Sequence, residues 1–170
     1  MKIKISLCCL LILSISISAK AQDARMKSVF IYNFVKYIEW PNQQQKNIFF
    51  IGVLTDSQIN SELENLLKNR KIGSQSVVVT VFQSVDEIFN CQVIFIPADQ
   101  SSKLDSVLKR IGTNPTLVIT EEFGLTKFGA GISFLNKQDN TLTFEINKNN
   151  ITKRGLKINS TLLNLGEEVF

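Results

Sequence analysis

Short apolar runs recur along the middle of the chain and alternate with polar segments of helical character. Each run is rich in β-branched and aromatic residues and has the length of a buried strand. The runs are residues 48–54, 77–82, 91–96 and 116–120. Two of them are followed by side chains that can cap a helix, Thr55-Asp56-Ser57 and the capping box that begins at Ser84. Continuous apolar strands that alternate with helices predict a mainly parallel sheet covered on both faces, an α/β fold.

The pattern changes after the fourth run. Three glycines between residues 124 and 131 predict a turn-rich loop. Two further strands, at 132–135 and 142–146, are joined by the polar residues 137–140, which predict an antiparallel hairpin at one edge of the sheet. The apolar residues of the tail, within 151–165, are numerous enough to pack back on the sheet.

The segment 25–41 predicts a helix with an unusually wide apolar surface. At about 100° per residue, its apolar side chains cover well over half of the circumference. They are Met26, Val29, Phe30, Ile31, Phe34, Val35, Tyr37, Ile38 and Trp40. The remaining strip is Ser28, Tyr32, Lys36 and Glu39. Packing on one sheet face needs a narrower stripe, so either the tail of the same chain or a partner protein covers the excess. Asn33 lies inside the apolar arc and needs internal hydrogen-bond partners there.

The first residues have the pattern of a secretory signal. A lysine-containing start precedes an apolar and serine run over 5–18, and Ala19-Lys20-Ala21 forms an A-x-A cleavage site. The alternative, a transmembrane anchor, needs about 20 apolar residues and is disfavoured by the shorter, serine-diluted run. We therefore predict a signal peptide over 1–21, one domain over 22–170, and no direct insertion into the membrane.

Removal of this segment changes the charge and the cysteine content. Three of the 19 basic residues lie in it, which leaves 16 against 15 acidic residues. Nucleic acid is therefore excluded as an expected partner, because phosphate binding needs a concentrated positive surface. Cys8 and Cys9 are also lost, so Cys91 remains alone and cannot form an internal disulfide. Its place in a predicted buried strand indicates a small core residue.

Candidate catalytic chemistry is sparse. The chain has no histidine, the commonest general base and metal ligand. No nucleophile motif such as G-x-S-x-G is present, and one cysteine cannot hold zinc. We predict no catalytic residue, no metal and no cofactor, and a hydrolase is disfavoured.

Four polar residues fall at the carboxyl ends of predicted strands. Thr55 and Asp56 follow the first run, and Thr120 and Glu121 end the fourth. Ligands bind at this edge in open α/β sheets, so these residues form an alternative hypothesis of a small-molecule site. Helix capping and simple solvation are the ordinary explanations for such acidic residues.

The block YNFVKYIEWP, residues 32–41, resembles the signature of the YfiR family of exported bacterial proteins. Further similar blocks follow in the expected order along nearly the whole predicted mature chain. They are IGVL at 51–54, CQVIFI at 91–96, GISF at 131–134, FEIN at 144–147 and GLKINSTLL at 155–163.

The resemblance implies a non-enzymatic periplasmic regulator with a Rossmann-like, three-layer α/β core. In that family, such a protein binds the periplasmic sensor region of an inner-membrane diguanylate cyclase and represses it, so that cyclic di-GMP responds to envelope signals. Other relatives accompany sensor histidine kinases. Relatives often carry a disulfide, which the lone Cys91 cannot provide. We expect Tyr32, Lys36, Glu39 and Trp40 to contact the partner, and a homodimer stays open.

Overall fold

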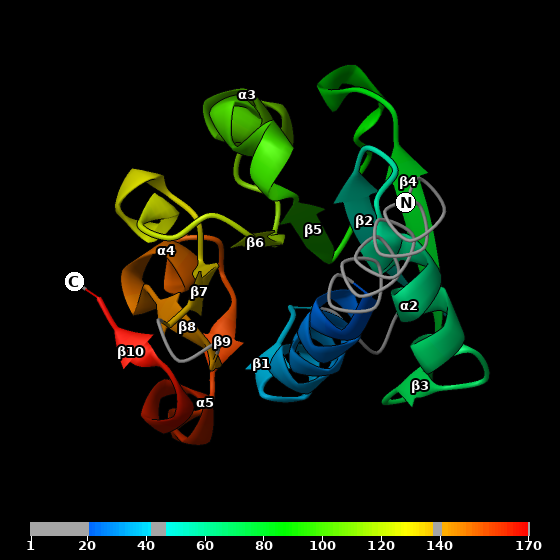
Figure 1. Ribbon diagram of the computed structural model, residues 1–170, viewed down its shortest axis with the longest axis horizontal. Helices are drawn as coiled ribbons and strands as arrows, with labels where there is room; N and C mark the ends of the chain where they lie inside the picture. Colours follow the sequence, from blue (N-terminus) through cyan, green and yellow to red (C-terminus); the bar gives the residue numbers. More distant parts are fainter. Residues whose placement is uncertain (1–20, 42–46, 138–140, 170) are drawn as a thin grey trace, which may run out of the picture.

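The structure, a computed structural model, describes residues 21–41, 47–137 and 141–169. The predicted signal peptide lies outside this part except for Ala21, as do most of the predicted hairpin turn at 137–140 and the loop residues 42–46. The described chain is mixed α/β, with a mostly parallel sheet that has helices on both faces (Figure 1).

Every predicted strand is present in the sheet. Its order is β10-β8-β7-β6-β5-β2-β4-β3. The strands are β2 (Ile48–Leu54), β3 (Lys71–Ile72), β4 (Gln75–Phe82), β5 (Val93–Ile96), β6 (Leu117–Thr120), β7 (Ile132–Asn136), β8 (Leu142–Ile146) and β10 (Glu167–Glu168). Neighbours from β4 through β7 run parallel, whereas β7 and β8 are antiparallel. The prediction of a mainly parallel sheet with an antiparallel pair toward one edge is therefore confirmed.

The two edges of the sheet are finished differently. The two-residue strand β10 pairs with β8 in parallel. At the other edge, the two-residue strand β3 pairs only with Gln75 and Ser76 of β4. Within the described ranges, no strand pairs with the outer side of β4 beyond Ser76.

The helices divide between the two faces. The N-terminal helix, described over residues 21–36, and α2 (Gln58–Leu67) lie on one face, and α3 (Leu104–Ile111) lies on the other (Figure 1). Shorter helical segments follow several strands. They are η2 (Val85–Glu87), η3 (Ala98–Lys103), η4 (Leu125–Phe128), α4 (Lys148–Thr152) and α5 (Ser160–Leu165).

Alternate residues of the central strands enter two separate cores. In β5, Val93 and Phe95 pack beneath the N-terminal helix and α2, while Ile94 and Ile96 pack beneath α3. The period of two follows from the pleat of the strand, which sends successive side chains to opposite faces. Because both faces are covered, both sets are apolar, which explains the unbroken apolar runs in the sequence.

The capping predictions are wrong in their hydrogen bonds. Ser57 and Ser84 occupy the N-cap positions of α2 and η2, but neither side chain accepts a capping hydrogen bond. Glu87 does reach back, and its Oε2 accepts from the backbone N–H of Gln83 at 2.9 Å. Both serines have an extended backbone, and each helical segment begins after them without a hydrogen bond from the serine hydroxyl.

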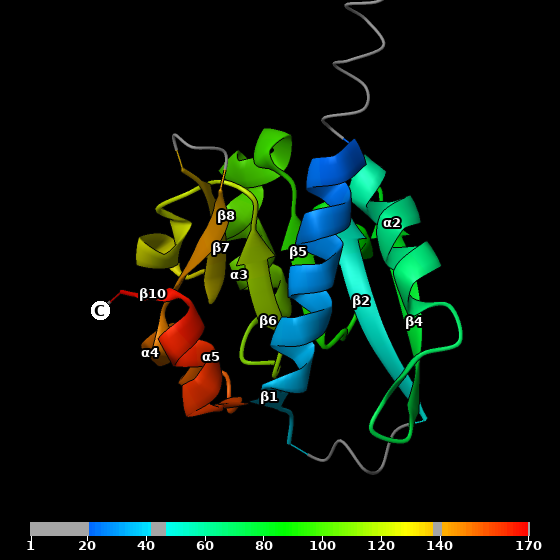
Figure 2. The same ribbon diagram turned by 60° about the horizontal axis from the view of Figure 1, so that its bottom comes forward.

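The tail covers the C-terminal end of the N-terminal helix, one of the two explanations offered for its wide apolar surface. The short strand β1 (Ile38–Glu39) pairs with β9 (Lys157–Ile158), and the backbone N–H of Asn159 donates to the carbonyl of Tyr37 at 2.9 Å. Leu156 and Leu162 are buried in the same core as the helix. Figure 2 shows the helix lying between α2 and α5 on this face of the sheet.

The rotation of the helix differs from the predicted one. Lys27 and Ser28 are buried, whereas Asn33, Met26 and Val29 are exposed. The prediction that Asn33 needs internal partners is therefore wrong. Burial of the polar pair is possible because each has a local or tertiary partner; Ser28 Oγ, for example, donates to the carbonyl of Ala24 at 2.9 Å.

Replacing Phe34 by alanine should lower the free energy of unfolding by about 3–5 kcal/mol, because the ring is fully buried and its loss leaves a cavity. Its centroid lies 4.6 Å from that of Phe144 in an edge-on contact. Urea denaturation of the variant measures the change. Phe128→Ala, at a ring that is 72% exposed, is the matched control and should change stability by less than about 0.5 kcal/mol. Equal effects of the two substitutions would contradict the described packing.

Candidate functional site

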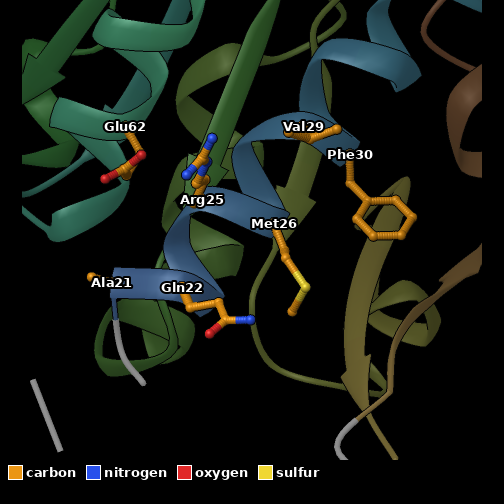
Figure 3. Close-up of a pocket in the computed structure, with 7 residues that line it drawn as sticks. All are labelled: Ala21, Gln22, Arg25, Met26, Val29, Phe30 and Glu62. Carbon is orange, nitrogen blue, oxygen red and sulfur yellow. The ribbon is translucent and has the colours of Figure 1, made fainter. Parts of the chain in front are cut away.

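The exposed side of the N-terminal helix carries an apolar groove, here called the helix groove. It has a volume of about 610 Å³ and is lined by Ala21, Gln22, Arg25, Met26, Val29, Phe30 and Glu62. Met26 and Val29 are 38% and 41% exposed. Figure 3 shows Arg25 on the side of Glu62 of α2, whereas Met26 and Phe30 project away from α2. The groove therefore combines an apolar centre with a charged margin.

One turn further along the N-terminal helix, two cationic side chains lie against the ring of Tyr32. Lys36 Nζ lies 4.1 Å from the centroid of its ring and Arg70 Cζ lies 5.0 Å from it. Hydrogen bonding by Arg70, with a smaller effect of Lys36, lowers the pKa of the Tyr32 hydroxyl below its usual 10.0. Tyr32 and Lys36, two of the predicted contact residues, thus form one polar surface next to the helix groove.

The other two predicted contact residues differ in accessibility. Glu39 is exposed on β1. Trp40 is only 6% exposed, its ring packs edge-on against Phe49, and its Nε1–H donates to the carbonyl of Gln92 at 3.1 Å. Trp40 therefore connects the end of the helix to the start of β5, and we leave it out of the contact surface because a partner cannot reach it.

A second hollow, here called the edge cavity, lies at the carboxyl ends of the strands and measures about 510 Å³. It is lined by Asp23, Ala24, Lys27, Ser57, Gln58, Ile59, Phe95, Pro97, Ala98, Asp99 and Glu121. Of the four residues predicted for this edge, Glu121 lines the cavity. Thr55, Asp56 and Thr120 are not brought together with it there.

Local bonds account for those three residues. Thr120 is buried, and its hydroxyl lies 2.6 Å from that of Ser133. Asp56 Oδ1 accepts a hydrogen bond from Asn60 at 2.7 Å. Thr55 occupies the turn between β2 and α2 with a positive φ of 66°. These residues shape the strand ends and do not line the cavity.

The most unusual group of the edge cavity is Lys27, which the sequence pattern did not single out. Its side chain is buried, and Nζ donates to Asp23 Oδ2 and, at 2.6 Å, to Glu121 Oε1. Burial alone would lower the pKa of Lys27, but the hydrogen bonds and charges of the two carboxylates outweigh it and raise the pKa above 10.5. The amine is therefore charged at neutral pH.

Glu121 is held from two sides. Besides the bond from Lys27, its Oε2 accepts from the backbone N–H of Ala98 at 2.9 Å. The carboxylate thereby links the ends of β5 and β6 to the first turns of the N-terminal helix. The acidic pair Glu121-Glu122 at the end of a strand gives no sequence signal for the contact with Lys27, because Lys27 lies 94 residues away in sequence.

A buried carboxylate, Glu145, is a further residue that the sequence pattern did not single out. Its Oε1 accepts from the Gly124 N–H and from the Thr126 hydroxyl, both at 2.8 Å. Gly124 and Gly129 bracket η4 with φ values of 84° and 113°, which confirms the turn-forming role predicted for them. The side chain of Asn150 donates to the carbonyl of Thr126 at 2.6 Å. These bonds make the loop between β6 and β7 a fixed part of the molecule.

Cys91 is a core residue, as predicted. It is buried beneath α3, and burial raises the pKa of its thiol to about 12. In the described ranges, no group of histidine, cysteine, aspartate or glutamate side chains is arranged to hold a metal ion.

A mixed α/β chain with an apolar groove on a surface helix has the features of a protein that binds other molecules. A family model described as YfiR/HmsC-like matches residues 24–167, and the chain belongs to this family. Membership indicates a regulatory protein of the periplasm. No curated protein matches the chain. Between residues 21 and 169, leaving out 42–46 and 138–140, no helix has the length and apolar content needed to cross a bilayer.

Replacing Lys27 by methionine should lower the free energy of unfolding by about 1–3 kcal/mol, since the chain keeps its packing but two carboxylates lose their partner. The loss stays moderate because the side chains of Asp23 and Glu121 are 35% and 28% exposed and can be hydrated. Chemical denaturation measures it. Lys68→Met, at an exposed position just after α2, is the control and should cost less than about 0.5 kcal/mol.

The contribution of Lys27 should also depend on pH in one direction. A group with a raised pKa in the folded state stabilises fully below its unfolded pKa and loses this contribution as the pH rises through the folded value. The stability difference between the parent chain and Lys27→Met should therefore be constant from neutral pH up to about pH 10 and shrink only beyond it. A difference that vanishes near neutral pH would contradict the ion pair.

Cys91 should resist alkylation in the folded protein. With its pKa raised to about 12, the thiolate is scarce at pH 8, and the buried sulfur is inaccessible. Iodoacetamide labelling of the chain from Gln22 onward should be at least about a hundredfold slower in buffer than in urea. Comparable rates in both media would show that the residue is reactive.

Proposed function

We propose that this protein is a periplasmic, non-enzymatic regulator that binds the periplasmic sensor region of an inner-membrane signalling enzyme and represses it. A diguanylate cyclase, whose product is cyclic di-GMP, is the first candidate partner and a sensor histidine kinase the second. Family membership over residues 24–167 supports the class. The single structural observation that carries the proposal is the helix groove with the exposed side chains of Met26 and Val29.

The groove has the composition of a protein interface. Contact surfaces between proteins are enriched in methionine, aromatic residues and arginine at their centre, with polar residues at the rim. Met26, Val29 and Phe30 provide the apolar centre here, and Arg25 provides a charge toward α2. The surface of Tyr32, Lys36 and Arg70, together with the exposed Glu39, extends it as a polar rim.

The helix groove lies on a part of the N-terminal helix that the rest of the described chain leaves exposed. The tail buries Ile38 through β9 and packs Leu162 into the same core. It does not extend over Met26 and Val29. The excess of apolar surface on the first turns is thus available to a partner.

Repression follows if the protein prefers one state of its partner. A binding protein shifts an equilibrium only by the difference in its affinity for the two states, so it must bind the inactive state of the sensor region more tightly. The export signal over 1–21, the single domain over 22–170 and the Rossmann-like description of the core belong to the same proposal. Cleavage after Ala21 removes one lining residue of the helix groove and leaves Met26, Val29 and Phe30 in place. The strand order β4-β2-β5-β6-β7 supports a doubly wound core, and it is the flavodoxin-like variant of that arrangement.

A photocrosslinking amino acid at position 29 of the full chain, expressed in its native host, tests the contact. We expect a crosslinked product with an inner-membrane cyclase or kinase, identified by mass spectrometry. The same label at position 78 is the control, because Val78 is 38% exposed on β4, outside the helix groove. Equal products from both positions, or no product with a membrane signalling enzyme, would refute the proposal.

Replacing Met26 and Val29 together by glutamine should weaken binding to that partner at least about tenfold, because central apolar contacts dominate interface energies. Cellular output of the enzyme should rise accordingly. Val78→Gln should leave both quantities unchanged.

A further inference from the structure

We propose that the edge cavity is a binding site for a small organic cation, a primary amine with a short apolar body. The site is separate from the helix groove, and the proposal does not depend on which protein binds there. The position of the cavity, its size, the charge of its lining and the fixed carboxylate of Glu121 favour such a ligand.

The position is the one where open α/β sheets bind ligands. From β2 the chain passes to β4 on one side and then returns to β5 on the other side of β2. Such a reversal of strand order opens a crevice between the connections at the carboxyl ends of the two strands. Ser57 follows β2, and Pro97 and Ala98 follow β5, and all three line the cavity.

The size and the apolar part of the lining suit a small organic molecule. A volume of about 510 Å³ falls within the usual range of small-molecule sites, about 300–1,000 Å³. Ile59, Phe95 and Pro97 are buried side chains of the lining and provide an apolar surface. A ligand body of a few carbon atoms can therefore leave water there.

The charges of the lining select the sign of the ligand. Asp23, Asp99 and Glu121 are carboxylates, and Lys27 is the cation among the lining residues. Lys27 is already bonded to Asp23 and Glu121. In the chain from Gln22 onward, the terminal ammonium adds a second cation beside Asp23, and three carboxylates against two cations still leave an excess of one negative charge. Asp99 is exposed and has no bond to Lys27. This excess of negative charge repels an anion and attracts an ammonium group.

The geometry of one carboxylate, that of Glu121, is set before any ligand arrives. Lys27 and the N–H of Ala98 each bond one oxygen of Glu121, so its rotamer is fixed. An ionised carboxylate has about four acceptor positions, and two of those on Glu121 remain. A preorganised acceptor loses little entropy when an ammonium binds.

Matched probes of one shape and three charges test the proposal. Hexylamine, hexanol and hexanoate are titrated into the chain from Gln22 onward by calorimetry at pH 7.5 and constant ionic strength. Hexylamine should bind saturably, with a dissociation constant of about 1–5 mM. Hexanol and hexanoate should bind at least about tenfold more weakly. No saturable binding of hexylamine, or equal binding of hexanoate, would overturn the proposal.

Variants locate the binding. Asp99→Asn removes an exposed lining charge without touching Lys27 and should weaken hexylamine binding about twofold to fivefold. Glu121→Gln should weaken it at least as much, but it also removes a partner of Lys27, so its fold is checked by thermal melting. Glu122→Gln makes the same change at the adjacent exposed residue, outside the lining, and should have no effect. Full binding by Asp99→Asn and folded Glu121→Gln would show that the amine binds elsewhere and would refute the site.

Discussion

Attachment of the N-terminal helix at both of its ends is the constraint on which the arrangement of the layers depends. At the carboxyl edge of the sheet, Lys27 bonds Glu121, and at the opposite edge Trp40 bonds the carbonyl of Gln92. Between them, residues such as Phe34 fill the core against the strands. Because a packed interior does not deform continuously, the helix cannot slide or rotate without breaking a buried polar contact and the aromatic packing together.

The sheet could be predicted from sequence because burial on both faces makes its strands continuous apolar runs, as in residues 48–54. The rotation of the helix could not, since a pattern assigns polar residues to solvent. Lys27 and Glu145 are buried against partners, Glu121 and Gly124, that are distant in sequence and that only the folded chain brings near. Trp40 shows the converse limit. Its place in a distinctive block suggested a contact residue, whereas its role is to join two elements of the core.

The first turns of the N-terminal helix line the edge cavity on one side and the helix groove on another. Asp23 and Lys27 face the edge cavity, whereas Met26 and Val29 line the helix groove. A ligand in the cavity and a protein in the groove would therefore contact one rigid element. Communication between them requires that this helix have two discrete positions, and the contacts at its ends decide what energy separates those positions. Release of the bond to Glu121 would free the first turns while the bond from Trp40 kept the far end in place.

The outer side of β4 is a strand edge that bears on how copies of the chain associate. Beyond Ser76, the residues Val77 to Phe82 include no charge and no proline, and within the described ranges no strand covers their edge. Proteins ordinarily protect such an edge with lysine, proline or a bulge, because its free N–H and C=O groups are a template for another strand. Self-association of this chain should therefore be governed by concentration, and it would begin as a continuation of the sheet from one copy into the next.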